Sequence, residues 1–265
     1  MKKFWFILTA LVATCFLVAC SGSQGVNTKT IKEKKKIVVA TESEFAPFEF
    51  KSLVNGKDTL VGADIELAKA IGERLGVKVE FSVMSFDNVL ASVQSGKSDI
   101  AIAGISVTDG RKKVYDFSDS YYTSENVVIV KKDKVNDFTS ADSLAKQTVG
   151  TQKGSVQETV AKKQISKASV VSLASNGEMI NELKSGQIQA VVLEKAIAEG
   201  YIAQNEDLTL ANFNLKSDGS DAYAVATRKG SDDLLKEINT VIKETKDSGK
   251  FDQWLKEAST YKQSK

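Results

Sequence analysis

The sequence predicts an α/β protein with two lobes, each a largely parallel sheet flanked by helices. Three observations predict this fold. Strand and helix patterns alternate from residue 37 onward, and one helix-and-strand pattern occurs twice. Roughly 230 of the 265 residues follow a leader and a polar segment, which is enough chain for two lobes of ordinary domain size.

Residues 1–19 have the composition of a secretory signal peptide. Two lysines precede an apolar stretch over 4–18, which is too short and wrongly flanked for a permanent membrane span. The sequence LVAC, ending at Cys20, resembles a bacterial lipobox and implies cleavage before Cys20 and lipid attachment to its sulfur. We therefore expect a chain held by a lipid anchor on the extracytoplasmic face of the cell membrane.

Residues 21–36, SGSQGVNTKTIKEKKK, are polar and lack periodicity. We expect residues 20–36 to be the lipidated cysteine and a flexible tether.

The composition excludes several classes of function. The chain contains no histidine, and after cleavage it keeps Cys20 as its only cysteine, so histidine- or thiol-based catalysis and most zinc sites are excluded. Removing Lys2 and Lys3 lowers the formal net charge from +2 to 0, which gives no reason to expect nucleic-acid binding. We expect neither a cofactor nor a metal.

The first lobe begins with alternating elements. A short apolar run predicts a strand at 37–40, and an apolar stripe with an acidic start and a glycine stop predicts a helix at 64–76. Further along, the patterns predict a strand at 77–83, a helix at 87–95 and a strand at 99–105.

An internal similarity supports two related lobes. Residues 87–104 match residues 177–194 in their apolar positions and in a Ser-Gly pair before each strand. In open α/β sheets, ligands bind beyond the carboxyl ends of the strands. Two facing lobes would therefore bring Gly104 and Glu194, where the matching strands end, to opposite walls of one cleft.

Ser106 and Arg111 lie five residues apart across a turn at Asp109-Gly110. A guanidinium offers paired donors to a carboxylate, and a nearby hydroxyl can complete the clamp. The alternative is that Arg111 caps a local helix or pairs with Asp109 or Asp116 on the surface.

Aromatic residues flank the same predicted edge. Pro47 fixes a rigid loop after the first strand, and we expect Phe48 and Phe50 in the core, with Phe45 on a cleft wall. Phe86 opens the helix after the second predicted strand, so it too lies at a carboxyl end. Two rings could sandwich an aliphatic stem or a guanidinium.

The second lobe contains TVGTQKGSVQETV over 148–160, which predicts a strand, a glycine turn and a helix with Ser155 as its N-cap. A helix N-terminus attracts anions. Lysine does not follow the second glycine, so this is not a nucleotide-binding loop.

Together, these residues resemble the polar amino-acid-binding lipoproteins and periplasmic proteins of ABC importers, the bacterial extracellular solute-binding proteins of family 3. The motifs that carry the resemblance are IVVATESEFAPFEF, LVGADIELAKAIGERLG, SGKSDIAIAGISVTDGRKKVYDFSDSYY, VGTQKGSVQE and SGQIQAVVLE. The resemblance implies a type II periplasmic-binding-protein-like fold with a two-strand hinge near 126–131 and 223–227. Lobe 1 would comprise 37–125 and 224–265, and lobe 2 would comprise 126–223.

The resemblance also implies a role for each site residue. Ser106 and Arg111, with backbone around Ser155, would hold the substrate carboxylate, and the Gly104 carbonyl and Glu194 would accept hydrogen bonds from its ammonium group. Phe45 and Phe86 would flank the substrate side chain. The residues near the tip of that side chain would be Glu42, Gln152 and Lys153. The chain departs from the family pattern at Glu194, commonly Asp, and at Gly104, which is Ser in some relatives.

We expect a monomer that captures a free polar L-amino acid by cleft closure, delivers it to the transmembrane subunits of an ABC permease, and has no catalytic activity. Glu42 favours a basic ligand (Arg or Lys), which we place ahead of Gln or Glu, whereas Lys153 argues for the second group. Two alternatives stay open. One is a cyclohexadienyl dehydratase-like enzyme that uses Glu42 or Glu194 as an acid, and the other is a surface adhesin or sensor.

Overall fold

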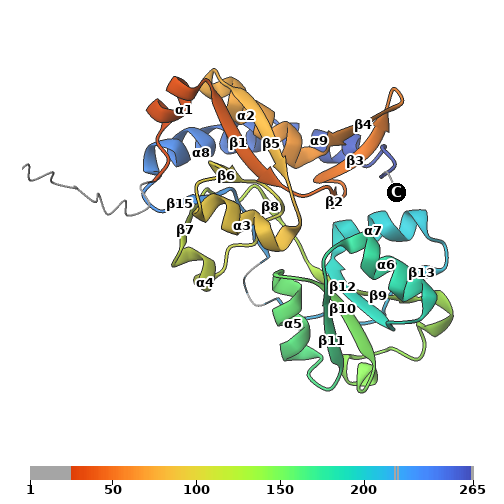
Figure 1. Cartoon of the computed structure of the whole chain (residues 1–265). Coiled ribbons are helices and arrows are strands. Elements are labelled where there is room, and N and C mark those ends of the chain that lie inside the picture. Colours follow the sequence, from red (N-terminus) through yellow and green to blue (C-terminus); the bar gives the residue numbers. More distant parts are fainter. Residues whose placement is uncertain (1–24, 218, 220, 264–265) are drawn as a thin grey trace, which may run out of the picture.

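The computed structural model describes residues 25–217, 219 and 221–263, which form two lobes around two five-stranded sheets (Figure 1). The predicted signal peptide and Cys20 lie outside the described residues.

The sheet of the first lobe has the strand order β5-β1-β6-β15-β7. Its strands are β1 (Lys36–Thr41), β5 (Lys78–Val83), β6 (Ile100–Ala101), β7 (Tyr115–Phe117) and β15 (Ala226–Arg228). The sheet of the second lobe has the order β11-β10-β12-β9-β13. Its strands are β9 (Asn126–Lys131), β10 (Thr148–Gln152), β11 (Ser169–Leu173), β12 (Ala190–Glu194) and β13 (Leu208–Leu210).

The two sheets share one topology. The fourth strand in each order is β15 in the first sheet and β9 in the second, and it is antiparallel to both of its neighbours. The other four strands of each sheet run in one direction. The predicted α/β fold with largely parallel sheets is confirmed. The internal similarity between 87–104 and 177–194 corresponds to equivalent helix-strand units in the two lobes.

Helices cover the sheets of both lobes (Figure 1). The first lobe carries α1 (Thr28–Lys34), α2 (Ala63–Leu75), α3 (Phe86–Gln94), α4 (Asp109–Lys112), α8 (Asp232–Asp247) and α9 (Lys250–Ala258). The second carries α5 (Val156–Gln164), α6 (Asn176–Ser185), α7 (Lys195–Gln204) and the 3₁₀ turns Lys132–Lys134 and Ala141–Leu144. Helices α8 and α9 pack on α2, so the end of the chain returns to the first lobe. No helix among the described residues is long and apolar enough to cross a membrane.

A smaller sheet lies beside the first lobe and reaches towards the second. It contains β2 (Glu44–Phe45), β3 (Glu49–Val54) and β4 (Lys57–Val61) in antiparallel pairing. The side chains of Phe48 and Phe50 are fully buried, as predicted for the segment around Pro47.

The chain crosses between the lobes next to a short antiparallel pair, β8 (Tyr122–Thr123) and β14 (Ala222–Tyr223). The hinge segments implied by the resemblance, near 126–131 and 223–227, begin at these crossings and extend into the sheets. Strand β9 pairs with a strand on each side in the second sheet, and β15 does so in the first. Since these ladders hold both strands within the sheets, the crossings fall just before β9 and at β14.

The flexible tether predicted over residues 20–36 is wrong for its second half. Asn27 caps α1 by accepting a hydrogen bond from the Thr30 amide at 2.8 Å. The Ile31 side chain is fully buried, and the Val26 amide donates to the Ser231 hydroxyl at 2.8 Å. The cap, the buried Ile31 side chain and the hydrogen bond to Ser231 order this lysine-rich segment, because the first lobe supplies the surface against which it packs.

The strand predicted over 99–105 is shorter in the structure. Ladder contacts to β1 run from the Asp99 amide, which donates to the Val38 carbonyl, to the Ile102 amide, which donates to the Ala40 carbonyl. Gly104 then has a φ of +53°, a left-handed conformation that bends the backbone out of the sheet.

Burial of Ile31 allows a stability test of α1. We expect Ile31→Ala to lower the free energy of unfolding by about 2–4 kcal/mol, because it removes a buried aliphatic side chain. Urea unfolding with the exposed Lys32→Ala as control measures this. A change below about 0.5 kcal/mol, as expected for a surface site, would show that α1 does not contribute to the fold.

Candidate functional site

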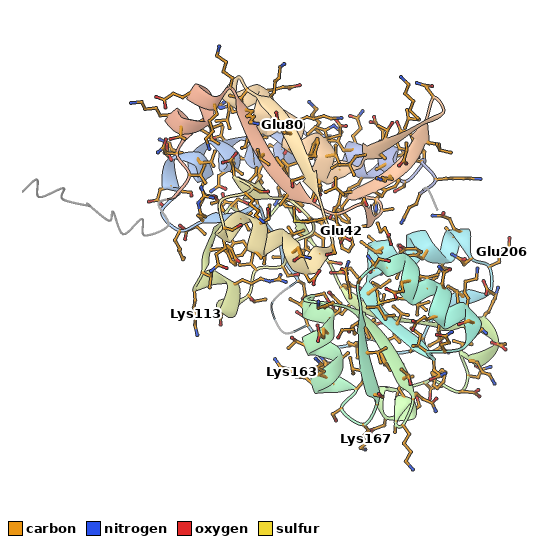
Figure 2. All side chains as sticks on the ribbon, in the orientation of Figure 1. Glu42, Glu80, Lys113, Lys163, Lys167 and Glu206 are labelled. Atoms are coloured by element: carbon orange, nitrogen blue, oxygen red, sulfur yellow. The ribbon has the colours of Figure 1, made fainter. Side chains whose placement is uncertain are left out.

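A contact between Glu42 and Gln152 joins the carboxyl ends of the first strands of the two lobes. Glu42 follows β1, and Gln152 ends β10. The Gln152 amide nitrogen donates to both carboxylate oxygens of Glu42, at 3.0 and 3.3 Å. Both residues are buried, and Figure 2 shows Glu42 at the junction of the lobes. The structure thus brings these two predicted site residues together across the cleft.

Arg111 joins the lobes at a second point. Its Nη1 donates to the Ser106 carbonyl at 2.8 Å, and its Nη2 donates to the Gly154 carbonyl of the second lobe at 3.1 Å. Its guanidinium carbon lies 5.8 Å from the centre of the Phe86 ring. Ser106 is buried, and its backbone forms an isolated antiparallel β-bridge with Tyr223. Ser106, Phe86 and Arg111 therefore form one group on the first lobe's wall.

The surface ion pairs considered for Arg111 are not formed. Asp109 is 3.8 Å from the ammonium of Lys112, and Asp116 is 2.6 Å from that of Lys229. Burial lowers the pKa of Arg111 to about 10, opposed by the negative charge of Glu194. The guanidinium stays cationic at neutral pH while largely shielded from water, a state that favours an anionic partner.

Glu194 provides the opposite charge. It ends β12, is buried, and faces Asn126 of β9, whose side chain accepts from the Gln157 amide at 2.7 Å. Burial raises the pKa of Glu194 to about 7, and the charge of Arg111 acts in the opposite direction. A cationic ligand group would favour the ionised form of this carboxyl.

The backbone at Gly104 is fixed by a hydrogen bond to a buried carboxylate. Its amide donates to the Asp64 carboxylate at 3.0 Å, and Asp64 also accepts from the Tyr121 hydroxyl at 2.8 Å. A β-carbon at position 104 would lie 2.5 Å from Cε1 of the Phe45 ring. Only glycine therefore allows Phe45 to pack here, and position 104 can offer only its backbone to a ligand.

The two predicted wall aromatics are mostly buried. The Phe45 ring packs at a tilt against the rings of Phe48 and Tyr223, at centroid distances of 5.8 and 6.3 Å. Phe86 is 9% exposed and packs in a separate cluster with Val89. Core packing thus holds both rings where the strands end.

Ser155 and Lys153 have separate positions in the second lobe. The Ser155 hydroxyl accepts from the Glu158 amide at 3.3 Å, so it is the predicted N-cap of α5. The ammonium of Lys153 lies 2.8 Å from the Asp87 carboxylate of the first lobe, and its side chain is 60% exposed. Of the three residues predicted near a ligand tip, Glu42 and Gln152 therefore contact each other between the lobes, whereas Lys153 forms an exposed ion pair between the lobes with Asp87.

Several buried acids near the cleft were missed in the sequence. Burial raises the pKa of Asp64 to about 6, and burial with the charge of Asp64 raises that of Glu49 well above its usual range. Asp64 opens α2, where an acidic residue is expected for the helix dipole alone. Its one distinguishing signal is its place between the apolar residues Ala63 and Ile65.

Comparisons with known proteins identify the family of this chain. The family described as bacterial extracellular solute-binding proteins, family 3, matches residues 37–258. The arginine-binding extracellular protein ArtP of Bacillus subtilis (strain 168) is 33% identical, over 97% of both chains. The ABC transporter glutamine-binding protein GlnH of the same organism is 31% identical, over 97% of this chain and 98% of that protein.

A solved structure gives a further likeness. It is the amino acid ABC transporter substrate-binding protein AbpA from Streptococcus pneumoniae Canada MDR_19A bound to L-arginine. That chain is 50% identical, with a TM-score of 0.85 over 87% of this chain and 97% of the other. The two-lobed fold is thus shared with a protein that holds an amino acid.

The raised pKa values predict a pH dependence of stability. Burial raises the pKa of Glu42 from 4.5 to about 8, so between these values the folded protein keeps a proton that the unfolded chain releases. We expect the free energy of unfolding to fall as pH rises from about 5 to 8, by up to ~1.4 kcal/mol per pH unit for each such carboxyl.

Glu42→Gln should make this slope shallower, and Glu80→Gln, which changes an exposed carboxylate, should keep the wild-type slope. Urea unfolding at a series of pH values measures it. A stability that rises across this window in the wild type would contradict the assignment.

Proposed function

We propose, since the chain belongs to the bacterial extracellular solute-binding proteins, family 3, that it captures an L-amino acid with a cationic side chain, arginine foremost. One observation carries this proposal. The Glu42 carboxyl is buried at the junction of the lobes, and its hydrogen-bond partner differs from those of Arg111 on the cleft wall. Capture would serve import through an ABC permease.

The backbone of the ligand would be recognised by opposite charges. Arg111 with Ser106, and the N-terminus of α5 at Ser155, would hold the α-carboxylate. Glu194 and the Gly104 carbonyl would accept from the α-ammonium. Arg111 and Glu194 each influence the pKa of the other, and this supports their assignment to the two oppositely charged ends of one zwitterion.

The side chain of the ligand would extend towards Glu42. An arginine guanidinium can replace the Gln152 amide as donor to this carboxyl and supply the charge that ionises it. The rings of Phe45 and Phe86 would flank the aliphatic stem. Since Asp87 pairs with Lys153 at the rim, the residue that argued for a glutamine or glutamate ligand is engaged elsewhere, and the order arginine before glutamine is strengthened.

The lobes would close on the ligand and open to release it. We propose that 37–125 with 224–265, and 126–223, move as the two units, because these stretches contain the two five-stranded sheets. Signal cleavage before Cys20 and lipidation of that residue would hold a monomer at the extracytoplasmic membrane face. Mass spectrometry of the mature protein should find a lipid group on an N-terminal Cys20, and an unmodified Cys20 would contradict the anchor.

A thermal-shift screen over the twenty amino acids tests the ligand class. We expect arginine to give the largest stabilisation, about 2.7 kcal/mol at a concentration of 100 times Kd, and lysine or glutamine to follow. A larger shift with glutamine or glutamate than with arginine would overturn the proposed order, and no shift with any of them would overturn the function.

Two variants separate the ends of the ligand in isothermal titration. Arg111→Ala should weaken every amino acid at least about 100-fold, because it removes a buried partner of the carboxylate. Glu42→Gln should weaken arginine by about 30-fold or more and leave glutamine within about threefold. Arg74→Ala, which breaks an ion pair with Glu237 in the first lobe, is the control. Unchanged affinity in Arg111→Ala would overturn the clamp.

A further inference from the structure

Glu44 lies between Glu42 and Phe45 in the chain, and its side chain contacts the second lobe. It pairs with Phe50 in the small sheet of the first lobe. Its Oε2 accepts a hydrogen bond from the Gly177 amide of the second lobe at 2.9 Å. Its carbonyl accepts from the Tyr201 hydroxyl at 3.2 Å and from the side-chain nitrogen Nδ2 of Asn176 at 3.4 Å. In Figure 1, β2 reaches from the first lobe towards α6 and α7.

The Glu44 carboxylate acts as a second cap on α6. The Ser175 hydroxyl already accepts from the Glu178 amide at 3.2 Å, which leaves other amides of the first turn without intrahelical partners. Gly177 is one of them, and the positive end of the helix dipole lies at the same place. A carboxylate supplied by the first lobe therefore satisfies a donor of the second.

These contacts tie the first lobe to the second beside the loop that carries the ligand-side residues. Glu42 and Phe45 lie two residues before and one residue after Glu44. We propose that Glu44 is a positioning residue: it latches the closed lobes to each other through the N-terminus of α6 without touching the amino acid. This inference rests on the proposed function.

The latch lies in a setting that lets it open. A groove of about 950 Å³ runs beside it, lined by residues that include Glu44, Gly177, Tyr201 and Gln263. The Gln263 amide donates to the Tyr201 hydroxyl at 3.3 Å. Water in such a groove can replace the bonds of a half-exposed carboxylate, so the latch favours closure without making it irreversible.

A latch of this kind has a characteristic effect on affinity. It stabilises the closed form by the same amount for every ligand, because it makes no contact that differs among them. A residue that touches the ligand side chain would instead change the ratio of affinities.

The central test is Glu44→Gln, with Glu178→Gln as the matched control. Both variants remove one carboxylate at the N-terminus of α6, but Glu178 is exposed and its carboxylate accepts from Ala174 of its own lobe. We expect Glu44→Gln to weaken arginine and glutamine by one common factor of about 5–20, through faster dissociation. Glu178→Gln should change either affinity less than twofold. A loss confined to arginine, or no loss, would overturn the latch.

Gly177→Ala gives a second route to the same contact. A β-carbon there would lie 3.0 Å from the Glu44 carboxylate oxygen, so the carboxylate must shift by a few tenths of an ångström. We expect a two- to fivefold loss of affinity for both ligands, while the melting temperature stays equal or rises because alanine favours helix. A loss of affinity with a falling melting temperature would point to damaged folding and contradict a specific latch.

A measurement of the distance between the lobes tests the latch without relying on ligand binding. In the full chain with Cys15→Ser and Cys20→Ser, dyes on Lys113→Cys and Lys163→Cys report the distance between the lobes (Figure 2). Glu44→Gln should shift the population towards larger separation, and an unchanged distribution would overturn the latch. If the wild type bound no amino acid, the proposed function would fail and this readout would still decide the latch.

Discussion

Each lobe depends on the other to satisfy polar groups buried between them. Burial of a charge or a hydrogen-bonding group without a partner is costly. The first lobe contributes Glu42 and Arg111, and the second answers with the Gln152 amide and the Gly154 carbonyl. The arrangement of the two lobes is therefore held by directional contacts between charged or polar groups. Under the proposed function, a ligand with its own charges would replace these contacts.

The shared topology of the lobes explains why those groups meet. Each sheet places the ends of its parallel strands at one edge, and the chain crosses twice beside the β8–β14 pair. The crossings join the edges so that β1 and β10 end facing each other. Glu42 and Gln152 then occupy corresponding positions in two lobes built alike, which is the reason the repeated pattern in the sequence was informative about the cleft.

The sequence predicted those parts that depend on local pattern. Strand β1, helix α2, the Ser155 cap and the buried Phe48 and Phe50 all follow from periodicity or from capping chemistry. It failed at helix α1, which forms because the first lobe buries Ile31. Nothing in the sequence indicated that Lys153 pairs with Asp87 of the first lobe, because the two residues are far apart in the chain.

The roles of Glu44 and Asp64 escaped the sequence for a related reason. An acid at a helix start or in a polar loop looks like any solvated acid until the fold shows what it meets. Glu44 accepts a hydrogen bond from a helix of the other lobe. Asp64 accepts hydrogen bonds from the Gly104 amide and the Tyr121 hydroxyl. Neither partner is near in sequence, so no local pattern could separate these acids from their exposed counterparts.

The raised pKa of Glu42 bears on how one cleft could serve ligands of different charge. With a pKa of about 8, this carboxyl is mainly protonated at pH 7, and ionising it costs about 1.4 kcal/mol per pH unit. Under the proposed function, a guanidinium offsets that cost by direct pairing and displaces the proton. A neutral amide leaves the proton in place and meets a carboxyl that can still donate and accept. Selectivity for arginine would then come from the excess of ion-pair energy over the cost of ionisation, which makes it a graded preference that falls as the medium becomes more acidic.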